Sequence, residues 1–262
     1  MSMHVRFLVV AALSVSLLTG RRLAAQDDVA DVVSRDLRAG KDEHKRYFLI
    51  GPPRSVKAPK QGYGLLVVLP GGGGGADFHP FIKAVYKNAV PEGYVLAQPV
   101  AVKWTEKQQI VWPTDKKRVE GMKFSTEEFV DAVIQDVGGQ YKLDPERAFT
   151  LTWSSSGPAA YAISLSSNKI TGSFIAMSVF QPKLLPPLEK AKGHGYFLYH
   201  SPDDDVCRIW MARWAVNALK KNGATVKLVT YTGGHGWKSD RYDRIREGIE
   251  WLEKNHEARA RP

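Results

Sequence analysis

Three groups of residues in this sequence carry side chains that can work together in nucleophilic catalysis. A serine cluster occupies residues 154–156, three consecutive aspartates occupy residues 203–205, and His235 lies in the string TGGHGW. A serine hydroxyl is a poor nucleophile unless a base takes its proton, and a histidine base needs a carboxylate that holds the right tautomer. The residue types and their order along the chain therefore indicate acyl-transfer chemistry.

Each of the three groups follows, within a few residues, a short apolar segment with the composition of a buried strand. The serines follow residues 148–152, the aspartates follow residues 195–200, and the histidine follows residues 225–231. In a parallel sheet flanked by helices, the carboxyl ends of the strands meet at one edge, where ligands bind. Five glycines, residues 71–75, follow another such segment and could present backbone N–H groups to an oxyanion at that edge.

Segments with strand and helix composition alternate along the rest of the chain. The strand-like segments are short and continuously apolar, which is typical of strands covered on both faces. Ser125, with Glu128 three residues later, predicts a capping box at the start of one helix. We therefore predict an α/β fold, a doubly wound and mostly parallel sheet with helices on both faces, in a single domain. The predicted strands cover residues 46–53, 64–70, 94–100, 148–152, 172–180, 195–200 and 225–231.

The beginning of the chain differs in composition from the rest. Arg6 precedes an apolar run over residues 7–18, and the segment closes on the small residues Ala24 and Ala25. This pattern is typical of a secretory signal peptide, and the run is shorter than the roughly 20 apolar residues that span a bilayer. We therefore expect a secreted or periplasmic protein without a stable membrane anchor. The alternative is a cytoplasmic protein with an apolar N-terminus.

The expected division of the chain has three parts. Residues 1–25 are predicted as the signal peptide, residues 26–45 as an N-terminal extension, and residues 46–262 as the folded domain. Within the extension, residues 28–37 suit a short amphipathic helix or a tail that lies on the domain. The single cysteine, Cys207, rules out an internal disulfide, so an oxidising compartment would add no cross-link.

The protein is basic, with a net charge of +10. Its basic residues are scattered, and none of the sequence signatures of RNA- or DNA-binding proteins accompanies them, so we expect no nucleic-acid partner. The charge indicates a solvated basic surface. A surface of this kind could still attract acidic polymers or anionic surfaces.

Several strings along the chain resemble one superfamily. They are LVVLPGGGG, EEFVDAVIQDV, LDPERAFTLTWSSSGPAAY, LYHSPDDDVC and GGHGW, and together they span roughly residues 47–252. The chain resembles the α/β-hydrolases, and within them the secreted esterases related to feruloyl esterases, polyhydroxybutyrate depolymerases and phospholipase/carboxylesterase-like proteins. The resemblance implies an α/β-hydrolase fold. The chain departs from the pattern at Pro70, which replaces a histidine, and at Thr152 and Ser156, which replace the outer glycines of G-x-S-x-G.

Steric arguments separate the serines as candidate nucleophiles. The residues two before and two after the nucleophile must be small, because strand and helix cross closely there. Centring the motif on Ser154 puts Thr152 and Ser156 at these positions, whereas centring it on Ser155 puts Trp153 at one of them. We therefore take Ser154 as the nucleophile, with Ser155 as the alternative.

The resemblance also implies roles for the other residues of the site. Asp204 falls at the position of the family's acid and His235 at that of its base. The N–H groups of Gly72 and Ser155 would form the oxyanion hole, and neither a metal nor an organic cofactor is required. Three tryptophans near these segments are candidates for the wall of the substrate pocket or for ordinary core positions: Trp104, Trp112 and Trp153.

Together these features predict a serine hydrolase that cleaves carboxylic esters through an acyl-enzyme. Its substrate would be a small-molecule or polymer-linked ester. Two alternatives stay open: a catalytically silent protein of the same fold that binds a glycan or polymer, and a peptidase or thioesterase on the same scaffold.

Overall fold

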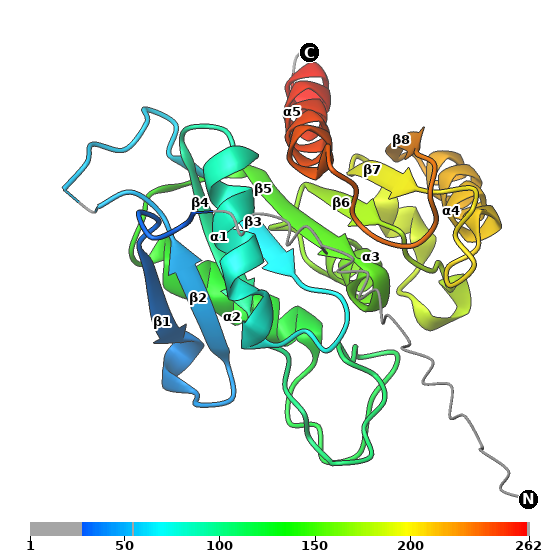
Figure 1. Cartoon of the computed structure of the whole chain (residues 1–262), viewed down its shortest axis with the longest axis horizontal. Coiled ribbons are helices and arrows are strands. Elements are labelled where there is room, and N and C mark those ends of the chain that lie inside the picture. The colour runs from blue at the N-terminus through cyan, green and yellow to red at the C-terminus, as the bar shows by residue number, and fades with distance from the viewer. Residues whose placement is uncertain (1–27, 54, 261–262) are drawn as a thin grey trace, which may run out of the picture.

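The fold is built around one eight-stranded sheet with the strand order β1-β2-β4-β3-β5-β6-β7-β8 (Figure 1). The computed structural model describes residues 28–53 and 55–260. Strands β4, β3, β5, β6, β7 and β8 run parallel, and β1 and β2 are antiparallel to their neighbours at one edge. The strands are β1 Ser34–Arg38, β2 Arg46–Ile50, β3 Tyr63–Leu69, β4 Tyr94–Pro99, β5 Leu143–Trp153, β6 Gly172–Ala176, β7 Gly195–His200 and β8 Thr225–Thr230.

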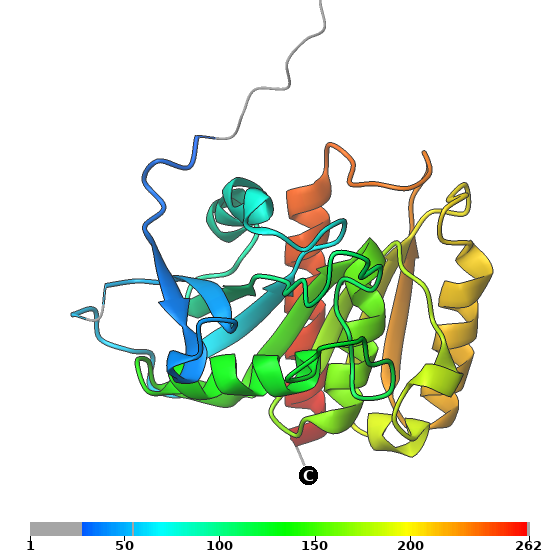
Figure 2. The same cartoon turned by 90° about the horizontal axis from the view of Figure 1, so that it is seen from below.

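Five α-helices cover the two faces of the sheet (Figures 1 and 2). Helices α1 and α5 pack on one face, and α2, α3 and α4 pack on the other. Within the described residues, none of the helices combines the length and apolar character needed to cross a membrane. The helices are α1 His79–Asn88, α2 Thr126–Gly138, α3 Gly157–Ser166, α4 Ile209–Lys221 and α5 Arg241–Ala260.

The central strands are apolar on both sides because both of their faces are covered. Every residue of β3 is buried, and alternate residues point to opposite faces. Leu65 and Val67 pack against the layer that contains α2, whereas Leu66 and Val68 pack against the layer that contains α1 and α5. The doubly wound, mostly parallel single-domain architecture predicted from the sequence is confirmed.

The capping box predicted for α2 is also confirmed. The Ser125 hydroxyl accepts a hydrogen bond from the Glu128 N–H at 3.2 Å, and the Glu128 carboxylate accepts one from the Ser125 N–H at 2.7 Å. Both bonds satisfy backbone N–H groups at the start of the helix, which have no partner within the helix itself.

The segment preceding β2 differs from the sequence prediction. The prediction of a short helix within residues 28–37 is wrong, because Ser34–Arg38 forms the edge strand β1. Leu37 lies opposite Tyr47 in the antiparallel pairing with β2, and Asp36 forms an ion pair with Arg46 across the two strands at 2.8 Å. The region predicted as an extension thus contributes a strand to the sheet. The predicted signal peptide lies outside the described residues.

Two predicted strand boundaries also shift. Strand β5 begins at Leu143 rather than at residue 148, because Leu143 pairs with Tyr63 of β3 before an irregularity in the register. Strand β6 ends at Ala176, whereas the prediction carried the strand to residue 180. The first change lengthens β5 at its amino-terminal end, and the second places residues 177–180 in the loop after β6, at the carboxyl edge of the sheet.

Candidate active site

The turn between β5 and α3 holds a serine in an unusual backbone conformation. Ser154, directly after the last residue of β5, has φ of 55°. A non-glycine residue in this left-handed region costs about 1–2 kcal/mol, and such strain persists where the surroundings enforce it. Part of that enforcement comes from Ser178, whose hydroxyl donates to the Ser154 carbonyl at 2.6 Å. The turn therefore projects the Ser154 side chain beyond the end of the strand.

The three adjacent serines have different environments. The Ser156 hydroxyl is buried and lies 2.7 Å from the Leu69 carbonyl, so it joins the ends of β5 and β3. The exposed Ser155 hydroxyl donates to the Gly72 carbonyl at 2.9 Å. The Ser154 hydroxyl lies 3.0 Å from Nε2 of His235. The structure therefore brings the Ser154 hydroxyl, out of the three, to the histidine.

Small and hydroxyl-bearing residues allow the close crossing of β5 and α3. A Cβ on Gly157 would lie 2.0 Å from the Ser178 hydroxyl oxygen, so this position requires glycine. Thr152 and Ser156, which stand where the resembled motif has glycines, are both fully buried. The Thr152 hydroxyl donates to the Phe174 carbonyl at 3.2 Å. The turn thus accommodates these two side chains by pairing their hydroxyls with backbone carbonyls.

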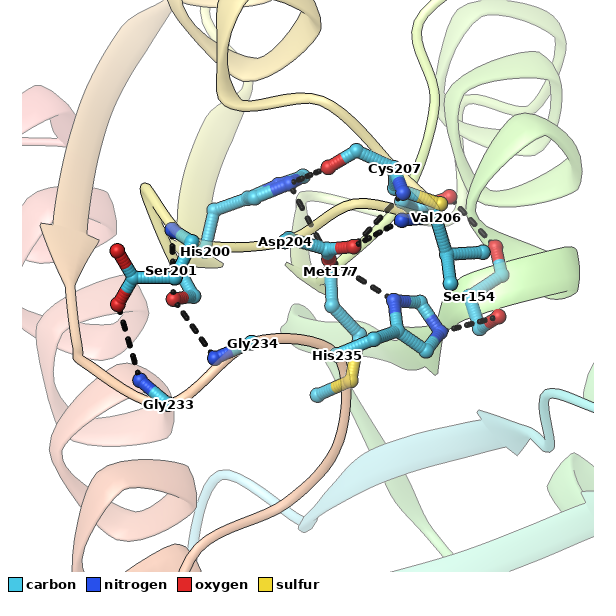
Figure 3. A network of polar contacts seen from close by, with 12 residues as sticks. Ser154, Met177, His200, Ser201, Asp204, Val206, Cys207, Gly233, Gly234 and His235 are labelled. Atoms are coloured by element: carbon cyan, nitrogen blue, oxygen red, sulfur yellow. Dashed lines mark hydrogen bonds and ion pairs between the residues drawn. The ribbon is translucent and has the colours of Figure 1, made fainter.

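His235 lies between Ser154 and Asp204 and is within hydrogen-bonding distance of both (Figure 3). Nδ1 of His235 lies 2.8 Å from Oδ2 of Asp204, and Nε2 lies 3.0 Å from Oγ of Ser154. An ionised carboxylate only accepts hydrogen bonds, so it places the proton on Nδ1 and leaves Nε2 free to accept the serine proton. The three side chains come from the carboxyl ends of β5, β7 and β8, as expected from the sequence.

The Asp204 carboxylate is buried, and both of its oxygens have polar partners. Its Oδ1 accepts hydrogen bonds from the backbone N–H groups of Val206 at 3.0 Å and Cys207 at 2.7 Å (Figure 3). Nε2 of His200 donates to the Cys207 carbonyl and lies 3.5 Å from Oδ2 of Asp204. Burial lowers the pKa of His200, so this ring is neutral at neutral pH. The carboxylate is therefore held in one orientation toward His235.

The loop that carries His235 is tied to the loop that carries Asp204. The Gly233 N–H donates to the Asp203 carboxylate at 3.2 Å, and the Gly234 N–H donates to the Ser201 hydroxyl at 3.2 Å (Figure 3). Gly233 and Gly234 both have positive φ, a conformation that favours glycine. These contacts set the position of the imidazole with respect to the acid.

The first glycines after β3 lie beside the serine turn. A Cβ on Gly71 would lie 2.5 Å from the Trp153 carbonyl oxygen, so glycine is needed for this approach. Gly72 has φ of 55°, and its carbonyl accepts the Ser155 hydroxyl. The Pro70 carbonyl accepts a hydrogen bond from Nε1 of Trp112 at 2.8 Å. The loop predicted to supply an oxyanion donor is thus held next to the turn that carries Ser154.

A cavity of about 210 Å³ opens beside Ser155. Its lining is mostly apolar, with glutamine, threonine and lysine side chains among it. Because Leu184 and Leu185 belong to the proline-rich segment 181–190, this segment forms part of the wall. The lining residues are Gln109, Ile110, Val111, Trp112, Thr114, Lys117, Ser155, Pro158, Val179, Gln181, Leu184 and Leu185.

The three candidate pocket tryptophans have separate locations. Trp112 lines the cavity. Trp153 is buried and packs edge-on against Phe81 and Trp237, away from the cavity lining. Trp104 packs edge-on against Phe124 and does not line this cavity either. Trp153 and Trp104 therefore pack as ordinary interior residues, which was the alternative to a place in the pocket wall.

Two residues at the end of β6 were not singled out from the sequence. Ser178 bonds to the Ser154 carbonyl, as described above. Met177 is a second non-glycine residue with positive φ at this edge, and its N–H donates to the Tyr199 carbonyl at 2.7 Å. The sequence signal for this turn is weak, because SVF continues the apolar character of the strand.

Asp204, Cys207 and His235 also form a group whose potential ligand atoms lie within 4.8 Å of one another. Burial, and then the nearby Asp204 charge, raise the pKa of the Cys207 thiol to about 11. The thiolate is the form that binds metals, and it is therefore disfavoured at neutral pH. The same histidine and aspartate atoms are already paired with each other. This donor set fits the hydrogen-bonded chain better than a metal centre.

Comparison with known proteins supports the fold. No protein-family model and no curated protein matches the sequence. Among solved structures, an α/β-hydrolase from a Medee basin deep-sea metagenome library aligns with a TM-score of 0.62, 13% identity, and coverage of 86% of this chain and 98% of its own. An esterase from Rhizomucor miehei aligns with a TM-score of 0.64, 12% identity, and coverage of 87% and 85%.

A third similar structure is Thermogutta terrifontis esterase 2 phosphorylated by paraoxon. It aligns with a TM-score of 0.61, 15% identity, and coverage of 84% of this chain and 94% of its own. At these identities the likeness concerns the fold. The predicted α/β-hydrolase fold is confirmed.

Proposed function

We propose that this protein is a serine hydrolase that cleaves carboxylic esters through an acyl-enzyme intermediate. The observation that carries the proposal is the continuous chain Ser154–His235–Asp204, with donor–acceptor distances of 3.0 and 2.8 Å. The left-handed backbone of Ser154 adds support, because strained residues concentrate at functional sites. The esterases among the structures of similar fold favour esters as the substrate class.

The reaction follows from the positions of the three side chains. Nε2 of His235 takes the proton from Oγ of Ser154 while Oγ attacks the ester carbonyl carbon. Asp204 stabilises the imidazolium that forms. As the tetrahedral intermediate collapses, the C–O bond to the alcohol breaks and His235 protonates the departing oxygen. Water then attacks the acyl-enzyme with His235 as base, and the carboxylic acid is released.

The negative charge on the tetrahedral intermediate requires hydrogen-bond donors. The N–H groups of Ser155 and Gly72 are the candidates, since Ser155 follows the nucleophile and the two residues are held together by the Ser155 hydroxyl. Removing one such donor typically lowers kcat about 10²–10³-fold. The role of Gly72 and Ser155 is part of the proposal.

The size of the cavity favours esters of short acids. The cavity volume of about 210 Å³ lies below the roughly 300–1,000 Å³ of typical ligand pockets, so a short acyl group fits it better than a long one. We therefore expect butyryl and hexanoyl esters to be cleaved faster than lauroyl and palmitoyl esters.

A panel of p-nitrophenyl esters of increasing chain length, together with hydroxycinnamoyl esters, tests the proposal. Turnover should be abolished in Ser154→Ala and only reduced in Ser155→Ala, which keeps the N–H proposed for the oxyanion hole and loses the hydroxyl bond to the Gly72 carbonyl. Asp204→Asn should lower kcat by about 10⁴-fold, because the amide no longer fixes the productive tautomer of His235. Loss of turnover in Ser155→Ala alone would assign the nucleophile to Ser155 and contradict the proposal.

The alternative functions correspond to distinct outcomes. A protein that hydrolyses no ester and does not react with a fluorophosphonate probe is a silent member of the fold, which the substitutions at Pro70, Thr152 and Ser156 would then explain. Faster turnover of thioesters or peptides than of matched oxygen esters would place the activity on those substrates instead.

A further inference from the structure

Helix α4 exposes an aromatic pair on its outward face. Trp210 and Trp214 are 52% and 44% exposed, and their rings stack with centroids 6.2 Å apart and an interplanar angle of 27°. Together with Val206, which is 66% exposed, they are three of the five large apolar side chains that the described residues expose. An exposed aromatic cluster of this kind marks a surface that contacts another phase or molecule.

The same face is positively charged. Arg213, Lys220 and Lys221 are exposed on α4, and Arg208 is exposed directly before it. None of these four side chains has an ion-pair partner among residues 28–53 and 55–260. Helix α4 contains no aspartate or glutamate, and the nearest exposed carboxylates along the chain are those of Asp203 and Asp205, before Val206. The charge on this face is therefore not neutralised within the helix.

Helical spacing brings the aromatic and basic residues together. Residues 210, 213, 214, 217, 220 and 221 are separated by three or four positions, so they share one side of the helix. All six are exposed, whereas Ala212, Ala215 and Leu219 on the other side are buried against the sheet. In Figure 2, α4 lies at the right-hand flank of the sheet with its outer side free of other elements. We call this surface, with Arg208 and Val206, the α4 face.

We propose that the α4 face docks reversibly on the surface of an anionic lipid bilayer. Tryptophan rings are favoured at the headgroup level of a bilayer, where their apolar body and polar N–H are both accommodated. Lysine and arginine beside them are attracted to anionic headgroups. The α4 face presents both groups on one side of a helix, so the tryptophan rings and the basic side chains can reach the headgroup region together.

Buried contacts link the α4 face to the cavity beside Ser155. The Trp214 ring packs edge-on against Phe180 with centroids 5.7 Å apart. Phe180 leads into the segment that supplies Leu184 and Leu185 to the cavity wall. The first residue of α4, Ile209, lies five residues after Asp204. The exposed tryptophan pair favours a lipid surface over a soluble polyanion, because tryptophan rings are enriched at the headgroup level of a bilayer.

The consequence for catalysis rests on the proposed esterase function, whereas the docking itself does not. An ester dissolved in the bilayer would lie close to the cavity and to the end of β5. Because α4 has only 13 residues and two exposed tryptophans, we expect weak binding that depends on its basic residues. Each lysine or arginine near an anionic surface contributes about fivefold to the affinity.

Vesicle sedimentation with the full chain tests the proposal. The probes are phosphatidylcholine vesicles with and without about 30% phosphatidylglycerol, the anionic component that basic residues would recognise. The protein should bind the anionic vesicles and bind the neutral vesicles much more weakly, and raising the salt concentration should release it. Arg213→Gln/Lys220→Gln should lower the affinity about 25-fold, which is the product of two fivefold effects. Trp210→Ala should also weaken binding.

A matched control changes exposed residues far along the chain from α4. Val56, Lys57 and Lys60 are exposed in the connection before β3, so Val56→Ser/Lys57→Gln/Lys60→Gln removes the same two charges and one apolar side chain. This control should bind as the unaltered protein does. Circular dichroism and urea unfolding of each variant establish that binding is compared between folded proteins.

Three results would overturn the proposal. The first is equal binding to neutral and anionic vesicles, or no binding to either kind of vesicle. The second is binding that the control variant loses as much as the α4 variants do. The third is equally tight, Trp210-dependent binding to heparin or to an oligodeoxythymidylate, which would identify a soluble polyanion as the partner. Fluorophosphonate labelling is scored separately, so a protein that docks but is not labelled refutes the esterase proposal alone.

Discussion

Replacing Ser154 by glycine and by alanine separates the backbone strain of the turn from the loss of the hydroxyl. Both variants lose the contact between the Ser154 hydroxyl and Nε2 of His235, so the cost of that contact cancels in the comparison. Alanine keeps a Cβ at φ of 55°, whereas glycine adopts this conformation without a steric penalty. The difference in unfolding free energy between the two variants therefore reports the strain.

The expected difference follows from two opposing effects. The left-handed conformation costs a residue with a Cβ about 1–2 kcal/mol. Glycine loses more conformational entropy on folding than alanine does, which costs about 0.5–1 kcal/mol. The midpoints of these two ranges differ by about 0.75 kcal/mol, so Ser154→Gly should be more stable than Ser154→Ala by about that amount, or about 1.5–3 °C in Tm for a domain of this size. Neither variant should hydrolyse esters.

Urea unfolding followed by circular dichroism measures this difference. Ser166 provides the matched control, because it is an exposed serine at the end of α3 with an ordinary negative φ. There the order should reverse, and Ser166→Gly should be less stable than Ser166→Ala. An alanine variant at Ser154 that is as stable as the glycine variant, or more stable, would refute the claim that this turn is strained.

Three further predictions concern the surroundings of the turn and of the acid. Gly157→Ala places a Cβ 2.0 Å from the Ser178 hydroxyl oxygen and should lower the unfolding free energy by about 1–3 kcal/mol in urea titrations; an unchanged midpoint would contradict the packing described. Ser156→Ala leaves the Leu69 carbonyl without the hydroxyl partner and should cost about 1–3 kcal/mol of stability while ester turnover persists. Turnover lost as completely as in Ser154→Ala would count against this structural role. Because burial lowers the pKa of His200 below 6.5, the unfolded state binds a proton that the native state excludes, so the unfolding free energy should fall as the pH is lowered through 6.5. His200→Gln should reduce that slope, and urea titrations between pH 5 and pH 8 that show the same slope would contradict the assignment.

The strands that carry the site were predictable because their surroundings determine their composition. Residues 64–70 were expected as a strand, and β3 is Tyr63–Leu69, since a strand buried on both faces is apolar at every position. The bounds of β7, Gly195–His200, match the expected segment. The expectation that serine, aspartate and histidine groups lie at one edge depended on these strands, and the structure places their side chains in contact.

The edge strand β1 could not be recognised from its own residues. Of its five residues, Leu37 alone is a large apolar one, and the others are a serine, two arginines and an aspartate. Charged residues are common on edge strands because they discourage pairing with other chains. What makes this segment a strand is its pairing with β2 and the ion pair between Asp36 and Arg46, which are contacts across a turn that local composition does not reveal.

The details of the site depended on contacts between distant segments. Ser156 is excluded as the residue facing His235 by its bond to the Leu69 carbonyl, 87 positions away. The location of Trp153 is decided by its packing against Phe81 and Trp237. Neither contact can be read from the local sequence. Export from the cell remains a prediction of the N-terminal composition.

The most direct test of the central claim is to identify the residue that a fluorophosphonate probe modifies. Reaction requires a serine hydroxyl that a base has activated, so the adduct reports the nucleophile itself. Mass-spectrometric mapping should locate the adduct on Ser154, and His235→Ala should slow labelling by orders of magnitude. An adduct on Ser155, or labelling that is independent of His235, would contradict the assignment of Ser154, His235 and Asp204 as one catalytic unit.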